Sequence, residues 1–265
     1  MEQSTTLLYA FLGGLLPALI WLWFFLKEDS KRPEPKWIIV AAFLSGMFAV
    51  ILALPLEMLG KCIATGTWPT TPFWYAHTTL SGTTPAPFGV FSYCAEIVGV
   101  TPIFLWAATE ELLKYAVALA VILWRRAVDE PIDAMVYLIT VALGFAAFET
   151  ALFLLEPLGR GDITNGILTG NLRFMGAALI HTLASAVVGF AIALTFYRSY
   201  IIQCFALCTG LILASVLHAL FNHHIIVGGG ERNAIVFFAV WLGVICLFLM
   251  FEKAKKITYF TRPQL

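Results

Sequence analysis

The feature that most constrains this chain is a series of long apolar runs, each near the roughly 20 residues that a helix needs to cross a bilayer. Only 12% of the 265 residues are charged and 60% are hydrophobic, whereas soluble domains carry about 25% charged residues. The sequence therefore predicts an all-α polytopic membrane protein, folded as a single integral domain over residues 1–265. We expect a multi-pass protein of the cell membrane, in contact with lipid along its length. The seven expected spans are 6–26, 37–57, 99–124, 132–155, 172–196, 201–226 and 234–252.

The distribution of basic residues predicts how these spans are oriented. With alternating topology, eleven of the 16 Lys and Arg residues fall in the set of connections that begins with 27–36 and ends with 253–265. Four belong to the opposite side, counting Arg173 at the outer end of the span 172–196, and the remaining one, Lys114, lies in the middle of a span. By the positive-inside rule the amino terminus is then outside and the carboxyl terminus is cytoplasmic. The long connection 58–98 becomes an extracytoplasmic loop.

Charge, cysteine spacing and the amino-terminal residues limit the function further. The formal net charge is zero, which gives no reason to expect a nucleic-acid partner. The five cysteines are not spaced as Cys-x-x-Cys pairs, so they form no metal motif. Cys62 and Cys94 both lie in the outer loop. The sequence does not decide whether they form a disulfide or remain free thiols. The first run lacks a basic leader and a cleavage signal, so we expect a retained span.

Three charges interrupt the run 99–124, where lipid would otherwise surround the helix: Glu110, Glu111 and Lys114. A charge near mid-bilayer costs roughly 2.5–3.5 kcal/mol on insertion scales, so such residues usually face a polar interior and mark a functional site. On a helix, Lys114 lies about 40° from Glu110 and about 60° from Glu111. The lysine can therefore hold either carboxylate ionised. A buried ion-pair network that only fixes helix packing is the alternative.

Polar residues in three other spans fall at a similar depth. With a rise of 1.5 Å per residue, Glu110 lies roughly 14–16 Å from the outer end of its span. Glu149, His181 and His218 lie roughly 9–14 Å from the outer ends of theirs. Asn222 follows His218 by one helical turn and shares its face. The shared depth predicts one site in a cavity between the helices of a core over 99–226, open toward the outer side.

Carboxylates beside imidazoles are compatible with general-base activation of water, with a catalytic metal and with a proton relay. In the first, Glu110 or Glu111 is the base, while His218 and Asn222 donate to a developing oxyanion. The second requires two histidines, a carboxylate and an open water position, as in many catalytic zinc sites. Spacing does not choose between them. If a metal is present, its ligands would come from His181, His218 and Glu149 or Glu111.

Four short blocks between residues 99 and 223 resemble the motifs of a known family. They are Glu110-Glu111-Leu112-Leu113-Lys114, Gly144-Phe145-Ala146-Ala147-Phe148-Glu149, Arg173 with His181-Thr182, and His218-Ala219-Leu220-Phe221-Asn222. In this order they are similar to those of PrsW-type intramembrane proteases, within the wider group of CAAX-processing and bacteriocin-processing (CPBP) membrane endopeptidases. The resemblance implies hydrolysis of a peptide bond in a single-span membrane protein, such as an anti-sigma factor, near the extracytoplasmic face. It also implies that the paired glutamates and both histidines form the site.

Two positions depart from the pattern of that family. After Glu149 the family has Asn and, one turn later, Tyr, where this chain has Thr150 and Phe153. The missing phenol removes one possible donor for an oxyanion or a substrate. The resemblance leaves the metal open. We favour a glutamate-activated water with no tightly held metal, and zinc as the alternative, because Lys114 beside the glutamate pair would oppose a second positive ion.

The leading hypothesis is an intramembrane endopeptidase in which Glu110 polarises the attacking water, because it is nearer than Glu111 to Lys114 in helical angle. His181 and His218 orient the water or stabilise the oxyanion. Two hypotheses from other classes remain: a proton- or cation-coupled transporter with a buried Glu, Lys and His relay, and a catalytically degraded membrane scaffold. No pair of spans reads as the inverted repeat typical of transporters. The supporting residues of the site are Lys114, Glu149 and Arg173.

Overall fold

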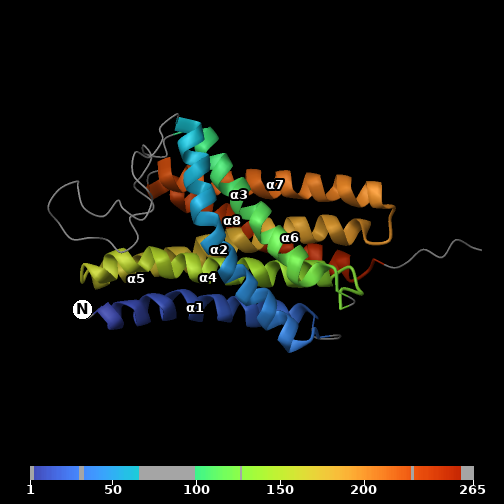
Figure 1. The fold of residues 1–265 in the computed structure, drawn as a ribbon, viewed down its shortest axis with the longest axis horizontal. Helices are drawn as coiled ribbons and strands as arrows, with labels where there is room; N and C mark the ends of the chain where they lie inside the picture. The colour runs from blue at the N-terminus through green and yellow to red at the C-terminus, as the bar shows by residue number, and fades with distance from the viewer. Residues whose placement is uncertain (1–2, 30–32, 66–98, 126, 228–229, 258–265) are drawn as a thin grey trace, which may run out of the picture.

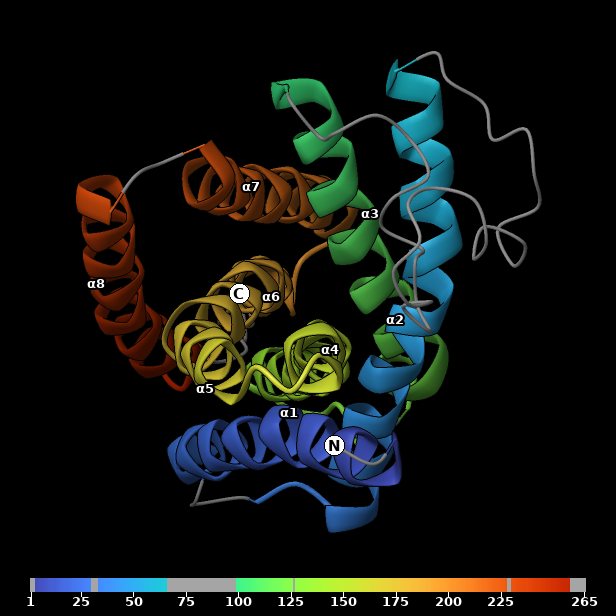
Figure 2. The same cartoon turned by 90° about the vertical axis from the view of Figure 1, so that its left-hand side faces the viewer.

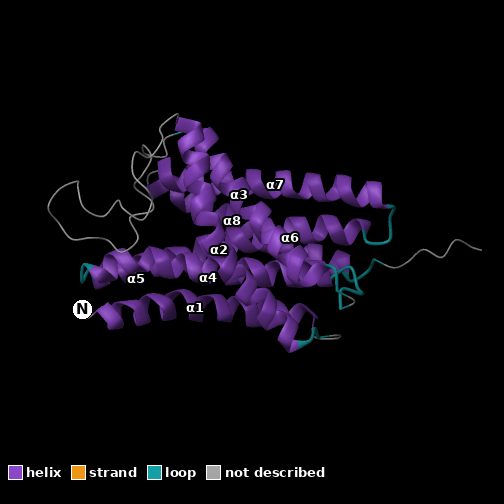
Figure 3. Ribbon diagram, viewed as in Figure 1, coloured by secondary structure: helices purple, strands orange, loops and turns teal. Residues whose placement is uncertain are grey.

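The computed structural model describes residues 3–29, 33–65, 99–125, 127–227 and 230–257, and every regular element in these ranges is a helix (Figures 1 and 3). The predicted all-α class is therefore confirmed. The elements η3 and η4 are short π-helical turns that continue longer helices. In chain order the elements are α1 (Gln3–Leu26), η1 (Lys27–Asp29), α2 (Lys36–Thr65), α3 (Val100–Ala118), η3 (Leu119–Leu123), α4 (Asp133–Gly159), α5 (Ile163–Leu172), η4 (Arg173–Ala177), α6 (Ala178–Thr195), α7 (Tyr200–Val227) and α8 (Gly230–Ala254).

Each of the seven predicted spans corresponds to one long helix or helical run. Six of them are long and apolar enough to cross a membrane, with α5, η4 and α6 acting as one continuous span. The remaining helix, α3, falls outside this set because it carries Glu110, Glu111 and Lys114 within 19 residues. The chain is thus a polytopic membrane protein. The orientation of its termini remains a prediction.

The second predicted span is longer than expected. α2 continues to Thr65, so residues 58–65, which the sequence assigns to the start of the outer loop, are helical. The apolar residues Met58, Leu59 and Ile63 extend the helix past the point where the hydropathy pattern weakens. Residues 66–98 lie outside the described residues, so the choice between a Cys62–Cys94 disulfide and two free thiols is not tested.

The predicted connection 156–171 is mostly helical as well. α4 reaches Gly159, and α5 begins only four residues later at Ile163. Asp162 caps the new helix, since its Oδ1 accepts a hydrogen bond from the backbone N–H of Asn165 at 3.0 Å. This bond and a second one from the Asn165 amide hold the pKa of the Asp162 carboxyl below its usual range.

α4 is the central helix and packs against α1, α2 and α6 (Figure 2). Its side chains are buried on almost all sides, which fits a helix that is apolar all round. Glycines allow α2 to approach it closely: a Cβ atom on Gly46 would lie 1.9 Å from the carbonyl oxygen of Val141, and one on Gly144 would lie 1.9 Å from that of Phe43. α2 and α4 therefore meet backbone to backbone, as small residues permit between membrane helices.

The remaining helices surround a polar interior. α3 packs against α2 and α7, and α7 packs against α6, which in turn lies on α4. α8 lies at the edge of the bundle beside α6 and α7 (Figure 2). Side chains from α3, α4, α6 and α7 can thus meet without facing lipid.

Replacing Gly46 with alanine should destabilise the protein, because the added methyl group fits only if α2 moves away from α4. We expect the free energy of unfolding to fall by about 1–3 kcal/mol, the range for overpacked sites. The matched control is Gly159→Ala, since nothing lies within 4 Å of the Cβ position at Gly159. Thermal unfolding in detergent measures both variants. Equal melting temperatures would show that the close approach of α2 and α4 is dispensable.

Candidate functional site

Six ionisable residues of the described part of the chain meet in the interior, and none of these residues is more than 9% exposed. We call them the ionic cluster. α3 supplies three of them, and α4, α6 and α7 supply one each. The residues that the sequence predicts at a similar depth in the membrane therefore lie together in the structure. The members of the ionic cluster are Glu110, Glu111, Lys114, Glu149, His181 and His218.

Glu111 is the most fully paired carboxylate of the ionic cluster. Its Oε1 accepts a hydrogen bond from Lys114 Nζ at 2.8 Å and another from His218 Nδ1 at 2.8 Å. The helical angle predicted Glu110 as the nearer partner of Lys114, and that order is wrong, because Nζ lies 3.7 Å from Glu110 Oε2. Contacts from α6 and α7 decide the pairing, since Lys114 also reaches His181 and Glu111 also receives His218.

His181 uses both ring nitrogens. Its Nδ1 lies 2.6 Å from Lys114 Nζ, and its Nε2 lies 2.9 Å from Glu149 Oε2. Because an ammonium group only donates, Nδ1 accepts and Nε2–H donates to the carboxylate. Glu149 also forms an ion pair with Arg173. A chain of contacts thus runs from Lys114 through His181 and Glu149 to Arg173.

Arg173 opens the π-helical turn η4, a kind of irregularity that is frequent at functional sites. Trp21 of α1 supports this turn, because its Nε1 donates to the carbonyl oxygen of Phe174 at 3.2 Å. The Nε of Arg173 donates to Thr150 Oγ1 at 3.0 Å, and its guanidinium carbon lies 4.1 Å from the ring centroid of Phe153. Both positions that depart from the family pattern therefore contact Arg173, and they support Glu149 through it.

Glu110 differs from the other carboxylates, because its buried Oε2 has no hydrogen-bond partner among the described residues. His181 Nδ1 lies 3.7 Å from it and His218 Nε2 lies 3.8 Å from it. Because Glu111 Oε1 accepts the proton on His218 Nδ1, the tautomer that carries this single ring proton presents a bare Nε2 toward Glu110. Acceptor atoms thus face one another at a buried point. A bound water or a cation would satisfy them.

Glu110, His181 and His218 fit a metal ion. One ligand atom from each lies within 4.8 Å of the other two. The remote nitrogens of the two imidazoles are bonded to Glu149 and Glu111, the arrangement that orients histidine ligands in metal sites. Two nitrogens and one carboxylate oxygen also match a catalytic zinc set. The sequence suggested Glu149 or Glu111 as the acidic ligand, whereas the structure offers Glu110, because the other two are already paired.

Glu57 of α2 is a carboxylate at this site that the sequence analysis missed. It interacts electrostatically with Glu149, Lys114 and Glu110. It is the last residue of the predicted span 37–57, where an acidic residue at the membrane surface needs no special explanation. The apolar continuation of α2 past this point was the available signal.

The charges around the site do not cancel when Glu57 is included. Lys114 is matched by Glu111, and Arg173 is matched by Glu149. Glu110 and Glu57 have no cation of their own among the described residues that surround them. Glu110 is fully buried, so a proton or a bound cation would balance its charge, whereas Glu57 is only partly buried. Because Glu111 already pairs with Lys114, the charge of this lysine opposes a metal ion at Glu110 less than the sequence suggested.

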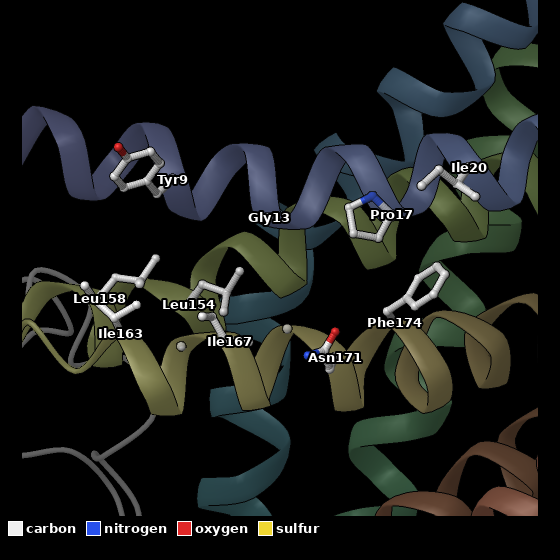
Figure 4. Close-up of a pocket in the computed structure, with 12 residues that line it drawn as sticks. Tyr9, Gly13, Pro17, Ile20, Leu154, Leu158, Ile163, Ile167, Asn171 and Phe174 are labelled. Carbon is white, nitrogen blue, oxygen red and sulfur yellow. The ribbon is translucent and has the colours of Figure 1, made fainter.

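Asn222 and a lateral cavity lie outside the ionic cluster. Asn222 is half-buried one turn along α7 from His218 and makes no hydrogen bond to the cluster residues. A cavity of about 430 Å³ opens between α1 and α5, lined by apolar residues such as Pro17, Leu154 and Ile167 (Figure 4). A narrower space beside it is lined by Arg173. The lining of the cavity can accommodate apolar groups. None of the residues of the ionic cluster lines it.

Comparisons with known proteins agree with the four sequence blocks. The family model described as PrsW family intramembrane metalloprotease matches residues 34–250. A protein named Protease PrsW from Oceanobacillus iheyensis is 27% identical over 178 residues, which cover 67% of this chain and 65% of that protein. Protease PrsW from Geobacillus kaustophilus is 28% identical over 179 residues, which cover 67% and 63%. The chain thus spans slightly less than two thirds of these relatives. No solved structure matches it.

Removing the guanidinium group with Arg173→Met should destabilise the protein strongly, because Glu149 would remain buried without its cation. The expected loss is about 3–5 kcal/mol in the free energy of unfolding. Adding Glu149→Gln to this variant should restore part of the loss, since the uncompensated charge is then gone. Thermal unfolding in detergent measures both.

The control for this pair is Arg160→Met, which breaks an ion pair with Glu156 whose side chains are 72% and 64% exposed. Exposed pairs contribute about 0–1 kcal/mol, so this variant should melt close to the wild type. A double variant no more stable than Arg173→Met would show that the two side chains are not energetically coupled.

Proposed function

This chain belongs to the PrsW family of intramembrane metalloproteases, and from that premise we propose that it is an endopeptidase that cleaves membrane-anchored proteins. One observation carries the proposal. The buried Oε2 of Glu110 has no hydrogen-bond partner in the part of the chain that the structure describes, and it faces ring nitrogens of His181 and His218. A water molecule between these atoms would have acceptors for both of its protons. Hydrolysis needs such a water in a place where its proton can be removed.

Glu110 acts as the base in this proposal. A water between Glu110 Oε2 and His218 Nε2 donates one hydrogen bond to each. Its oxygen attacks the carbonyl carbon of the substrate while Glu110 takes its proton, which forms the new C–O bond. The same carboxyl group then gives the proton to the amide nitrogen as the C–N bond breaks. The products are one carboxylic acid and one amine.

The neighbouring residues hold this geometry and stabilise charge. Glu111 and Glu149 orient the rings of His218 and His181 through their remote nitrogens. Lys114 keeps Glu111 ionised and places an ammonium group 3.7 Å from Glu110 Oε2, close to where an oxyanion would develop. The amide of Asn222, one turn away on α7, is a further donor for the oxyanion.

A metal ion is compatible with the same atoms. Glu110, His181 Nδ1 and His218 Nε2 would hold a divalent ion such as zinc, as the description of the family suggests. When bound, such an ion lowers the pKa of a coordinated water and polarises a carbonyl group. Lys114 would then shift from His181 Nδ1, because the nitrogen cannot serve both partners, and it would keep its bond to Glu111.

The proposed substrate is a single-span membrane protein of the anti-sigma-factor type, cut near the extracytoplasmic face. The depth of Glu110, Glu149, His181 and His218 in their spans supports that face, together with the predicted orientation of the chain. A substrate with one membrane helix could reach a buried site sideways through the bilayer.

Glu110→Gln should reduce cleavage of single-span substrates by at least about 100-fold, because an amide cannot accept the proton of the water. The measurement uses purified protein in detergent, with the products identified by mass spectrometry. Glu156→Gln, an exposed change on α4, is the matched control and should cleave normally. Full activity of Glu110→Gln would remove this role of Glu110. Ion flux into liposomes without cleavage by the wild type would favour a transporter.

Treatment with a zinc chelator tests the metal. If Glu110, His181 and His218 hold an ion that takes part in catalysis, cleavage should fall at least tenfold and return when zinc is restored. The metal content of His218→Ala should then be below that of the wild type, which gives a readout independent of activity. Cleavage that persists in metal-free protein would favour water activation by the glutamate alone.

A further inference from the structure

The indole N–H of Trp106 is a buried donor without a hydrogen-bond partner among the described residues. Trp106 precedes Glu110 by four residues on α3, so both side chains lie on the same face of the helix, one turn apart. The indole N–H can only donate, and an unpaired buried donor costs about 1–3 kcal/mol. Two of the buried polar atoms that lack a partner, Trp106 Nε1 and Glu110 Oε2, therefore lie along one stripe of α3.

Glu57 places an acceptor beside this donor. Its carboxyl group interacts with the Trp106 indole, although no hydrogen bond of ordinary geometry joins them. The side chain of Glu57 is only partly buried, and it interacts electrostatically with Glu149 and Lys114. The close packing of α2 on α3 and α4 holds it there. The Trp106 donor thus lies one helical turn from Glu110, and the Glu57 carboxyl group on α2 interacts with both of these residues.

A substrate helix needs hydrogen-bond partners for its backbone where it opens next to the catalytic glutamate. Its backbone N–H and C=O groups are bonded to one another within the helix, so the scissile bond becomes accessible only when the helix opens locally. The groups freed by this opening find no water in the hydrocarbon region, and each unsatisfied group costs several kcal/mol. A protease that supplies one donor and one acceptor beside its base lowers that cost.

We propose that Trp106 and Glu57 form a subsite that binds the opened backbone of the substrate next to the scissile bond. Trp106 Nε1–H donates to a carbonyl oxygen of the substrate, and a carboxyl oxygen of Glu57 accepts a substrate N–H. The opened segment is thereby held one turn of α3 from Glu110. This inference rests on the proposed endopeptidase function and adds positioning residues to it.

Trp106→Phe tests the donor, because it keeps an aromatic ring and deletes only the N–H group and part of the indole. KM for a single-span peptide should rise about three- to tenfold while kcat stays within about twofold, as expected for loss of one uncharged hydrogen bond made in both the ground and transition states. Trp37→Phe is the matched control, since Trp37 is exposed at the other end of α2 and lies outside the site.

Glu57 is tested with two variants. Glu57→Leu removes the acceptor and should raise KM to a similar or greater extent. Glu57→Gln keeps an acceptor oxygen and should restore KM to within about threefold of the wild-type value. The probe is a synthetic single-span peptide that the wild type cleaves, together with a series in which each amide near the cut is replaced in turn by an ester.

The ester series separates positioning from general stability. An ester lacks the N–H group and has a weaker acceptor oxygen, so the wild type should lose affinity at the positions that meet Glu57 and Trp106. That loss should disappear in Glu57→Leu and Trp106→Phe at the corresponding positions. Unchanged ester profiles overturn the subsite, even where melting temperatures fall, while cleavage by the wild type leaves the proposed function standing. If the wild type cleaves no peptide, the proposed function itself fails.

Discussion

The ammonium group of Lys114 is the contact on which the interior of this protein depends. It joins α3 to α6 through His181, and through Glu111 it fixes the ring of His218 on α7. His181 in turn contacts Glu149 on α4, and Glu149 pairs with Arg173 in the π-helical turn η4. A charge without a partner is expensive in a membrane interior, so these residues tolerate few alternative arrangements of the helices. Holding charges out of water is tolerated where each one meets a partner, as in the pairs Lys114–Glu111 and Arg173–Glu149.

One atom escapes this mutual pairing, and the proposed chemistry resides there. Glu110 and Glu111 lie on the same helix and are both buried, yet Glu110 Oε2 faces imidazole nitrogens and has no hydrogen-bond partner among the described residues. The difference arises because the cation and the imidazole proton that could satisfy it go to Glu111 instead. Two adjacent glutamates thus acquire different roles from their neighbours on other helices, one holding the structure and the other open to a ligand.

Hydropathy and helical periodicity could predict the spans, the depth of the polar residues and the helices that carry them, because these depend on spacing along one chain. The four blocks that resemble the PrsW family could be read directly as well. The partner of Lys114 could not be predicted, since it depends on where His181 and His218 approach from other helices. Glu57 was missed because the end of a span is poorly defined by hydropathy. The contacts of Thr150 and Phe153 with Arg173 required the turn of η4, which leaves no mark in the sequence.

The close crossing of α2 and α4 at Gly46 has a mechanical consequence for the site. Glu57 follows Gly46 by eleven residues on the same helix, a distance of about 16 Å at 1.5 Å per residue. At that distance from the crossing, a tilt of α2 by about five degrees displaces Glu57 by about 1.4 Å. Helices change tilt when the hydrocarbon layer thickens or thins. If a thicker or thinner bilayer tilts α2 about this crossing, the distance between Glu57 and the ionic cluster changes with it.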